Sequence, residues 1–292
     1  MQKQTDCSGA DSETPPAKRL ISGLFHYSSP VLLHFLTGQV LAYLSLWLVR
    51  NRSDAQDAYI GQVMTVTGLT GLLTGFFLLI IYHRDHKKRI IKACPDICPV
   101  LFPSLPQILL LLMMGAGLAQ YMNLLMVFVG KYLPQGTYYE DMAAVSGGKS
   151  LLSMIFWMGI AAPFGEEMVF RVLVFLRLRD HLRLLPSAIL SAVFFGVYHG
   201  NIIQGIYAGI LGLLFALIME WSGCLTSSFF LHAGANIWML IVSEYAWRLI
   251  LPPWDRIYFA LSTIMILSIF AGFRYYHRFY RSARADDSGL QK

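Results

Sequence analysis

Residues 151–175 read LLSMIFWMGIAAPFGEEMVFRVLVF, an apolar stretch that is interrupted by three charged residues, Glu166, Glu167 and Arg171. A stretch of this length can cross a bilayer as a helix. Each ionisable group at membrane depth costs roughly 2.5–3.5 kcal/mol on insertion scales, so such groups usually face the interior of a bundle and mark function. The stretch therefore predicts a membrane helix that carries a polar site.

The whole chain has the composition of a polytopic membrane protein. Of its 292 residues, 56% are hydrophobic and only 14% are charged, whereas about 25% of a typical soluble domain is charged. The net charge of +6 does not indicate a nucleic-acid partner, because most Lys and Arg lie in loops where membrane orientation places them. We expect an all-α, polytopic transmembrane bundle in the lipid bilayer.

Apolar segments predict about eight spans in a single domain. They are roughly residues 30–49, 58–82, 104–130, 150–176, 187–200, 202–219, 226–246 and 257–276. Residues 1–25 are polar and are predicted to be a disordered cytoplasmic tail. Residues 26–284 form the expected transmembrane domain, with a motif core at 150–240, and residues 285–292 form a C-terminal tail.

The distribution of basic residues predicts the orientation of the bundle. Basic clusters follow three of the expected spans, at residues 84–92, 177–183 and 274–284. With both termini in the cytoplasm, about 16 of the 23 Lys and Arg lie inside and about six lie outside. Cytoplasmic loops carry the excess of positive charge, so we predict this orientation.

Helical geometry predicts different roles for the three charged residues Glu166, Glu167 and Arg171. Adjacent residues on a helix point about 100° apart, so Glu166 and Glu167 face different directions. Glu167 and Arg171 are i,i+4 neighbours and can pair, and an always-charged arginine needs a carboxylate partner when buried. We therefore predict a structural role for Glu167 and Arg171 and a chemical role for Glu166. The alternative is one structural ion network of all three.

Two further polar motifs lie on later spans. Phe195 and His199 are i,i+4 neighbours, as are His232 and Asn236, so each pair shares a helix face. At about 1.5 Å per residue from the cytoplasmic helix ends, Glu166, His199, His232 and Asn236 lie roughly 16, 18, 9 and 15 Å deep. This shared layer predicts one site, although each motif alone is also typical of polar helix packing.

Other features are assigned to packing alone. Polar residues outside the motifs, such as His34 in the first span, lack a motif partner and are interpreted as forming local hydrogen bonds. Gly71 with Gly75 and Gly205 with Gly209 are small-residue pairs that permit close helix approach. We attach no function to them.

The three motifs resemble those of the CPBP (Abi) family, which includes type 2 CAAX prenyl proteases and lysostaphin-resistance-protein-A-like proteins. The family pattern is E-E-x-x-x-R, then F-x-x-x-H, then H-x-x-x-N or D, and this chain matches every fixed position across about residues 150–240. The resemblance implies an α-helical intramembrane endopeptidase. Carried over by position, Glu166 and His199 activate a water, His232 and Asn236 stabilise the oxyanion, and Glu167 and Arg171 support the site.

The resemblance leaves the place of a metal open. Glu166, His199 and His232 have the donor types of a three-ligand zinc site. We favour the reading without a metal, in which glutamate and histidine activate water, and expect no cofactor. The substrate is then a peptide or protein, anchored in or near the membrane.

Two hypotheses of different class follow. In the first, the protein is an intramembrane endopeptidase that cuts near the inner leaflet of a bacterial plasma membrane. In the second, it is a non-catalytic immunity or scaffold protein that binds a bacteriocin-like peptide or a membrane partner. A transporter is less well supported, because the chain has no clear inverted repeat of broken helices.

Overall fold

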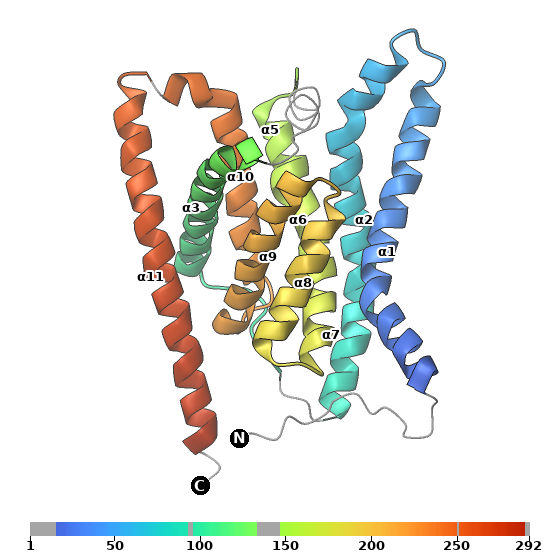
Figure 1. Ribbon diagram of the computed structural model, residues 1–292, viewed down its shortest axis with the longest axis vertical. Coiled ribbons are helices and arrows are strands. Elements are labelled where there is room, and N and C mark those ends of the chain that lie inside the picture. Colours follow the sequence, from blue (N-terminus) through green and yellow to red (C-terminus); the bar gives the residue numbers. More distant parts are fainter. Residues whose placement is uncertain (1–15, 93–95, 133–146, 250, 290–292) are drawn as a thin grey trace.

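The computed structural model describes residues 16–92, 96–132, 147–249 and 251–289, and within them every extended element is helical (Figure 1). An isolated β-bridge joins Val100 to Cys224. The prediction of an all-α fold is confirmed. Five of the described helices are long and apolar enough to cross a membrane, within the ranges Gly23–Val49, Ala55–Ile91, Leu105–Val129, Ile202–Ser222 and Trp254–Ser282.

The helices follow the predicted spans closely. Seven of them are α1 (Pro16–Val49), α2 (Ala55–Ile91), α3 (Leu105–Val129), α8 (Leu184–Tyr198), α9 (Ile202–Ser222), α10 (Ser227–Leu249) and α11 (Trp254–Gly289). The fourth span is a continuous helical run of five parts, α5 (Leu151–Met154), η2 (Ile155–Ala161), α6 (Ala162–Glu167), η3 (Met168–Phe175) and α7 (Leu176–Arg179). A short 3-10 turn, η1 (Gly130–Tyr132), follows α3.

The helices at the two ends of the chain extend into the predicted tails. α1 begins at Pro16, so residues 16–25 are helical rather than part of the tail. A proline is well tolerated in the first turn of a helix, because the amide hydrogen that it lacks has no partner there. α11 continues to Gly289, five or so residues past the expected end of the membrane domain. Residues 1–15 and 290–292 lie outside the described residues.

Local capping explains the short connection between α8 and α9. Gly200 has φ of 67°, a left-handed conformation that glycine adopts without the steric penalty of a side chain. Asn201 then caps α9, because its side-chain oxygen accepts hydrogen bonds from the amides of Ile203 and Gln204. The two helices therefore turn back on each other at Gly200 and Asn201, between the predicted spans 187–200 and 202–219.

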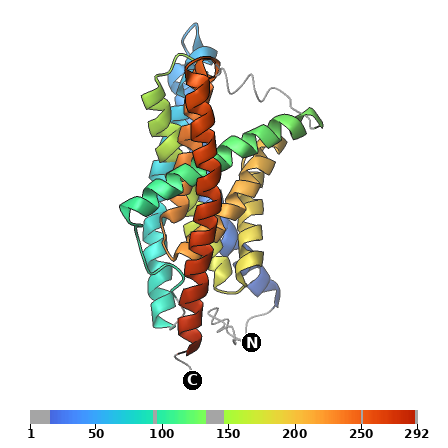
Figure 2. The same ribbon diagram turned by 90° about the vertical axis from the view of Figure 1, so that its left-hand side faces the viewer.

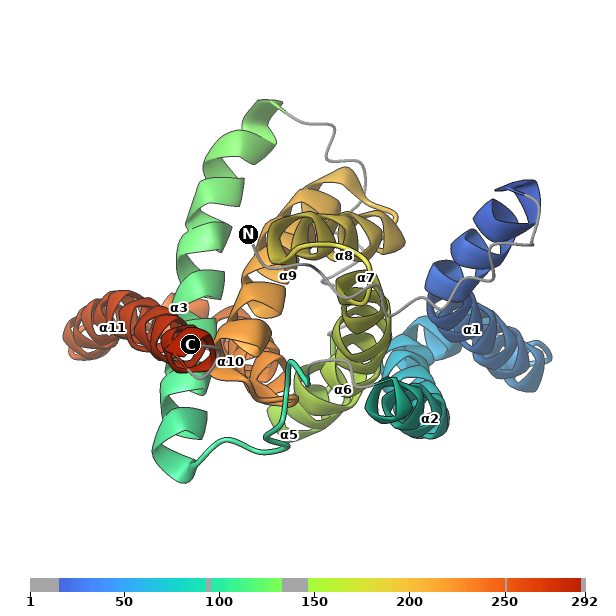
Figure 3. The same ribbon diagram turned by 90° about the horizontal axis from the view of Figure 1, so that it is seen from below.

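The run from α5 to α7 occupies the middle of the bundle. Seen from below, α6 lies between α10 on one side and the pair α1 and α2 on the other, with α8 and α9 closing a third side (Figure 3). α3 runs obliquely behind α11 (Figure 2), and these two helices lie on the far side of α10. α1 and α11 carry many exposed apolar side chains, as lipid-facing helices do.

Glycine contacts bring α2 against the central run. A Cβ atom at Gly71 would collide with the carbonyl oxygen of Ala161, and one at Gly165 would collide with the backbone of Gly71. Gly75, the other member of the pair, lies against the ring of Phe164. Small residues permit such backbone approach between membrane helices. The contact places α2 directly beside Glu166.

Ion pairs join the helices at the end of the bundle where α1 begins and α11 ends (Figure 1). Arg89 of α2 binds Asp180 after α7 at 2.8 Å, and Arg177 binds Asp85 at 2.8 Å. The basic clusters of α2, α7 and α11 all lie at this end. That the end is cytoplasmic stays a prediction.

Candidate active site

The two glutamates lie on a short α-helical piece between two π-helical segments. α6 ends at Glu167, and η2 and η3 flank it. π-helical turns are rare and are frequent at functional sites, because they widen the helix and change the direction of its side chains. The sequence predicts a helix here but does not indicate this change in helix type.

Glu167 is the centre of a buried ion network. Its Oε2 lies 3.3 Å from Nε of Arg171, and its Oε1 lies 2.9 Å from Nδ1 of His232. The Glu167 side chain is 4% exposed and that of Arg171 is 0% exposed. The i,i+4 pair is therefore present, and His232 joins it from α10.

The guanidinium of Arg171 lies between aromatic rings. Its Cζ is 4.3 Å from the ring centroid of Phe195 and 5.2 Å from that of Phe215. Its three nitrogens are buried without a hydrogen-bond partner in the described part of the chain. The ion pair with Glu167 and the faces of the two rings are what stabilise the buried charge.

Glu166 occupies a different environment from its neighbour. Its side chain is 14% exposed, and its Oε2 lies 3.6 Å from Nε2 of His232. The two nitrogens of His232 thus face two carboxylates, with Nδ1 toward Glu167 and Nε2 toward Glu166. Because Glu167 is engaged by both Arg171 and Nδ1 of His232, Glu166 is the carboxylate with capacity for a further partner.

His199 is oriented by its own helix end. Its Nδ1 lies 2.8 Å from the carbonyl oxygen of Phe195. A carbonyl oxygen only accepts hydrogen bonds, so Nδ1 carries a proton and Nε2 is the nitrogen left for chemistry. The imidazole packs edge-on against the Phe195 ring at 4.8 Å, and the same ring packs edge-on against His232 at 5.7 Å. Phe195 therefore spaces the two histidines.

Asn236 lies one helical turn beyond His232. Its Nδ2 donates a hydrogen bond of 2.9 Å to the carbonyl oxygen of Met158, in the π-helical segment η2. An amide nitrogen has two hydrogens, and this contact uses one of them. The bond joins α10 to the central run on the side that precedes Glu166.

The structure brings His34 and Tyr198 to this region, although neither residue belongs to a motif that predicts a catalytic role. The imidazole of His34 lies 5.4 Å from the Tyr198 ring, and that ring lies 5.5 Å from the ring of Phe170, four residues after Glu166. His34 does form a hydrogen bond, and its partner is Thr74 on the neighbouring helix α2. No signal in one sequence indicates a partner on another helix.

The donor set does not form a closed metal site. Among the described residues, no group of three His, Cys, Asp or Glu side chains is arranged to hold a metal ion. Nδ1 of His199 and Nδ1 of His232 are engaged by the Phe195 carbonyl and by Glu167, respectively, so Nε2 is the nitrogen of each ring that remains for a ligand. The preference for a site without a metal stays a prediction.

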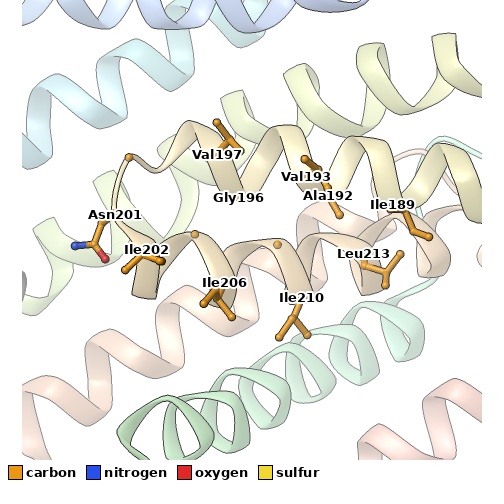
Figure 4. Close-up of a pocket in the computed structure, with 13 residues that line it drawn as sticks. Ile189, Ala192, Val193, Gly196, Val197, Asn201, Ile202, Ile206, Ile210 and Leu213 are labelled. Carbon is orange, nitrogen blue, oxygen red and sulfur yellow. The ribbon is translucent and has the colours of Figure 1, made fainter. Parts of the chain in front are cut away.

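An apolar groove runs along α8 and α9 (Figure 4). Its volume is about 650 Å³, and it ends at Gly200 and Asn201, next to His199. Apart from Asn201, the side chains that line it are apolar, and they do not include Glu166, His199 or His232. The groove is thus a neighbour of the polar site and not the site itself.

Residues 148–238 match a family model described as type II CAAX prenyl endopeptidase, Rce1-like. Over these residues the chain is similar to the CAAX protease-like family. The matched segment begins just before α5 and ends within α10, so it includes every polar motif described above. The search of curated proteins and that of solved structures found no match. The matched family consists of CAAX proteases, and the five long apolar helices indicate an integral membrane protein.

Proposed function

We propose that this protein is an intramembrane endopeptidase that hydrolyses a peptide bond near the inner leaflet, with a water activated by Glu166 and His199. The observation that carries the proposal is the asymmetry of the two glutamates. Glu167 is enclosed by Arg171 and His232, whereas Glu166 is partly exposed and lies 3.6 Å from the second nitrogen of His232. A general base needs such access to its proton donor.

In the proposed reaction, Glu166 accepts a proton from the water as the water oxygen attacks the peptide carbonyl. The attack forms a tetrahedral intermediate with a negatively charged oxygen, and the proton is then delivered to the leaving amine. His199 presents Nε2 to the same water, because its Nδ1 is held by the Phe195 carbonyl. Breakdown of the intermediate releases a carboxylate and an amine, so the atoms of one water are consumed.

His232 and Asn236 are the proposed oxyanion donors. Nδ1 of His232 is engaged by Glu167, so Nε2, when protonated, is the donor that remains. Asn236 retains one amide hydrogen beyond the one that it donates to Met158. Preorganised donors of this kind usually contribute a large share of catalysis in acyl transfer.

The proposed substrate is a peptide or protein with a membrane anchor. The groove along α8 and α9 supports this class, because an apolar lining that ends beside His199 suits an apolar segment whose polar end enters the site. A bacterial plasma membrane is the proposed location. Glutamate and histidine activate the water in this proposal, without zinc.

The test is proteolysis by purified protein in detergent, on a library of membrane-tethered and farnesylated peptides, with and without chelator. We expect wild type to cleave and Glu166→Gln to lose cleavage by at least about 10³-fold while it melts like wild type. His199→Ala should lose cleavage as well, and chelator should leave the rate unchanged. Cleavage that survives in folded Glu166→Gln would remove Glu166 from the mechanism.

The matched control is Glu167→Gln, the neighbouring carboxylate with a structural role. We expect this variant to lower the melting temperature strongly, because it leaves the buried Arg171 without its counterion. If no form cleaves any peptide and Glu166→Gln melts below wild type, the motifs hold the bundle together, and the non-catalytic immunity or scaffold function replaces the proposal.

A further inference from the structure

His34 is a buried polar side chain on α1, a helix with many exposed apolar side chains. It is 4% exposed, and its Nδ1 lies 2.6 Å from Oγ1 of Thr74 on α2. The Thr74 hydroxyl donates its own hydrogen to the carbonyl oxygen of Thr70 at 2.6 Å. The Thr74 oxygen therefore accepts from His34, Nδ1 carries the proton, and Nε2 is free to face another group.

The surroundings of His34 belong to the candidate active site. Its ring packs against Tyr198 at 5.4 Å, and Tyr198 directly precedes His199. The Tyr198 ring also packs against that of Phe170, four residues after Glu166 on the central run, at 5.5 Å. The hydrogen bond to Thr74 is sufficient to dock α1 onto α2. Docking alone does not require that His34 also lies against Tyr198, next to His199.

The helix contacts explain how α1 reaches the site. α2 touches α6 backbone to backbone where Gly71 meets Gly165, the residue before Glu166. Thr74 lies one turn along α2 from Gly71 and so holds His34 at the level of the glutamates. Figures 1 and 3 place α1 and α2 on the side of α6 that faces away from α10. His232 and His34 thus approach the central run from different sides.

We propose that His34 is a positioning residue of the active site, which acts through Glu166. Thr74 orients the imidazole through Nδ1, and Nε2 faces the Glu166 carboxyl group and the water that it holds. The inference rests on the proposed endopeptidase function and adds a fourth helix, α1, to the machinery. The family match does not reach α1, because it begins at residue 148.

Two isosteric substitutions separate this role from helix docking. In His34→Asn the amide nitrogen takes the place of Nδ1, so the bond to Thr74 is kept and the Nε2 position is lost. In His34→Gln the amide takes the place of Nε2, and the bond to Thr74 is lost. We expect His34→Asn to melt like wild type with kcat lowered roughly 10- to 100-fold, as for a misplaced catalytic group, and KM unchanged.

His34→Gln should show the converse behaviour, with a lower melting temperature and a kcat closer to that of wild type. Thr74→Val is the matched control, since it removes the docking bond and keeps the imidazole, and it should lower stability more than kcat. A His34→Asn variant with wild-type kcat would overturn the proposal, because the bond to Thr74 would then account for the whole effect.

A second measurement keeps the proposal independent of cleavage. Nitrogen-15 NMR of the eight histidines in detergent, with the His34 signals assigned from His34→Asn, reports on the surroundings of Nε2. We expect Glu166→Gln to shift the His34 Nε2 signal and Glu244→Gln, an exposed carboxylate on α10, to leave it unchanged. An unshifted signal in Glu166→Gln would also overturn the proposal.

The two readouts distinguish the possible failures. If wild type cleaves no peptide but the His34 signal responds to Glu166→Gln, the endopeptidase function fails while His34 still contacts the site. If wild type cleaves and His34→Asn is fully active, the function stands and His34 is a docking residue.

Discussion

At the scale of single residues, Arg171 is a charged side chain that is buried at the candidate active site and depends on its neighbours for stabilisation. It is fully buried, one carboxylate faces it, and two aromatic rings cover it. An always-charged side chain in such a place requires its counterion. The same carboxylate holds Nδ1 of His232, so the structural pair also orients a proposed catalytic imidazole.

The pairing of Arg171 with Glu167 is testable by removing one charge and then both. We expect Arg171→Leu to lower the free energy of unfolding by about 3–5 kcal/mol, because it leaves Glu167 buried and uncompensated. The double variant Arg171→Leu, Glu167→Gln should recover much of that loss. Thermal unfolding in detergent measures both, and a double variant that is less stable than Arg171→Leu would contradict the pairing.

Asn236 allows the proposed oxyanion role to be separated from packing. Asn236→Ala removes both amide hydrogens, so we expect kcat to fall by about 10²–10³-fold. The lost bond to Met158 should lower stability by only about 0.5–1.5 kcal/mol. Peptide cleavage and thermal unfolding check the two effects, and a variant with wild-type kcat would remove Asn236 from the oxyanion site.

At the scale of elements, the contact of α2 with the central run determines where Glu166 lies. Gly71 and Gly165 meet backbone to backbone, and no larger residue fits between them. π-helical segments lie on either side of α6. One of them, η2, contains Met158, whose carbonyl oxygen accepts the hydrogen bond from Asn236 of α10.

A pair of glycines on α2 tests this contact. We expect Gly71→Ala to destabilise the protein by about 1–3 kcal/mol through overpacking and to lower activity, because Ala161 and Gly165 must move. Gly61→Ala is the matched control on the same helix, since nothing lies within 4 Å of its added Cβ, and it should stabilise by up to about 1 kcal/mol. Equal effects of the two substitutions on the melting temperature would show that the helix contact is loose.

The connections at the end of α2 and between α9 and α10 hold two buried thiols. Cys98 is 6% exposed and Cys224 is 3% exposed. Burial raises the pKa of the Cys98 thiol well above its usual range and also raises the pKa of Cys224. At neutral pH both are therefore protonated, and the thiolate is the reactive form.

Alkylation tests the packing of these connections. In a Cys7→Ser, Cys94→Ser background, we expect maleimide at neutral pH to label the native protein slowly and to label both thiols after unfolding. Ser53→Cys, at an exposed position after α1, is the positive control and should react at once. Rapid labelling of native Cys98 would mean that the segment before α3 does not pack as described.

At the scale of the whole molecule, the basic clusters define one end. The ends of α2, α7 and α11 carry these clusters and lie together, and carboxylates pair with some of the basic groups there, as in Arg89 with Asp180 and Arg177 with Asp85. These ion pairs connect α2 to the end of the central run. The basic residues at this end still outnumber the carboxylates that pair with them.

The positive end should face the cytoplasm. We expect a fluorescent-protein fusion at the C-terminus to fluoresce in a bacterial host and an alkaline-phosphatase fusion at the same place to be inactive. Fusions inserted after Arg52, at the opposite end of α1, should give the reverse pattern. Phosphatase activity from the C-terminal fusion would invert the topology and place the proposed site nearer the outer leaflet.

The number and order of helices could be read from sequence because they depend on local properties. Each apolar run long enough to cross a membrane must satisfy its own backbone hydrogen bonds, and a helix does so. The place of the turn at Gly200 and Asn201 was predictable, because one predicted span ends at residue 200 and the next begins at residue 202. The start of α1 at Pro16 was not, because a polar helix outside the apolar region is not indicated by hydropathy.

Sequence alone determined the helical fold and the resemblance to a protease family, and it predicted the site residues, because spacing along a helix places Glu166 apart from Glu167 and pairs Glu167 with Arg171. Only the tertiary structure decided how Glu167 is shared with His232, that Asn236 binds Met158, and that His34 binds Thr74 on another helix. These contacts join residues that are distant in the chain. They depend on how closely the helices pack and on the local widening of one of them, and neither property is encoded in a local pattern.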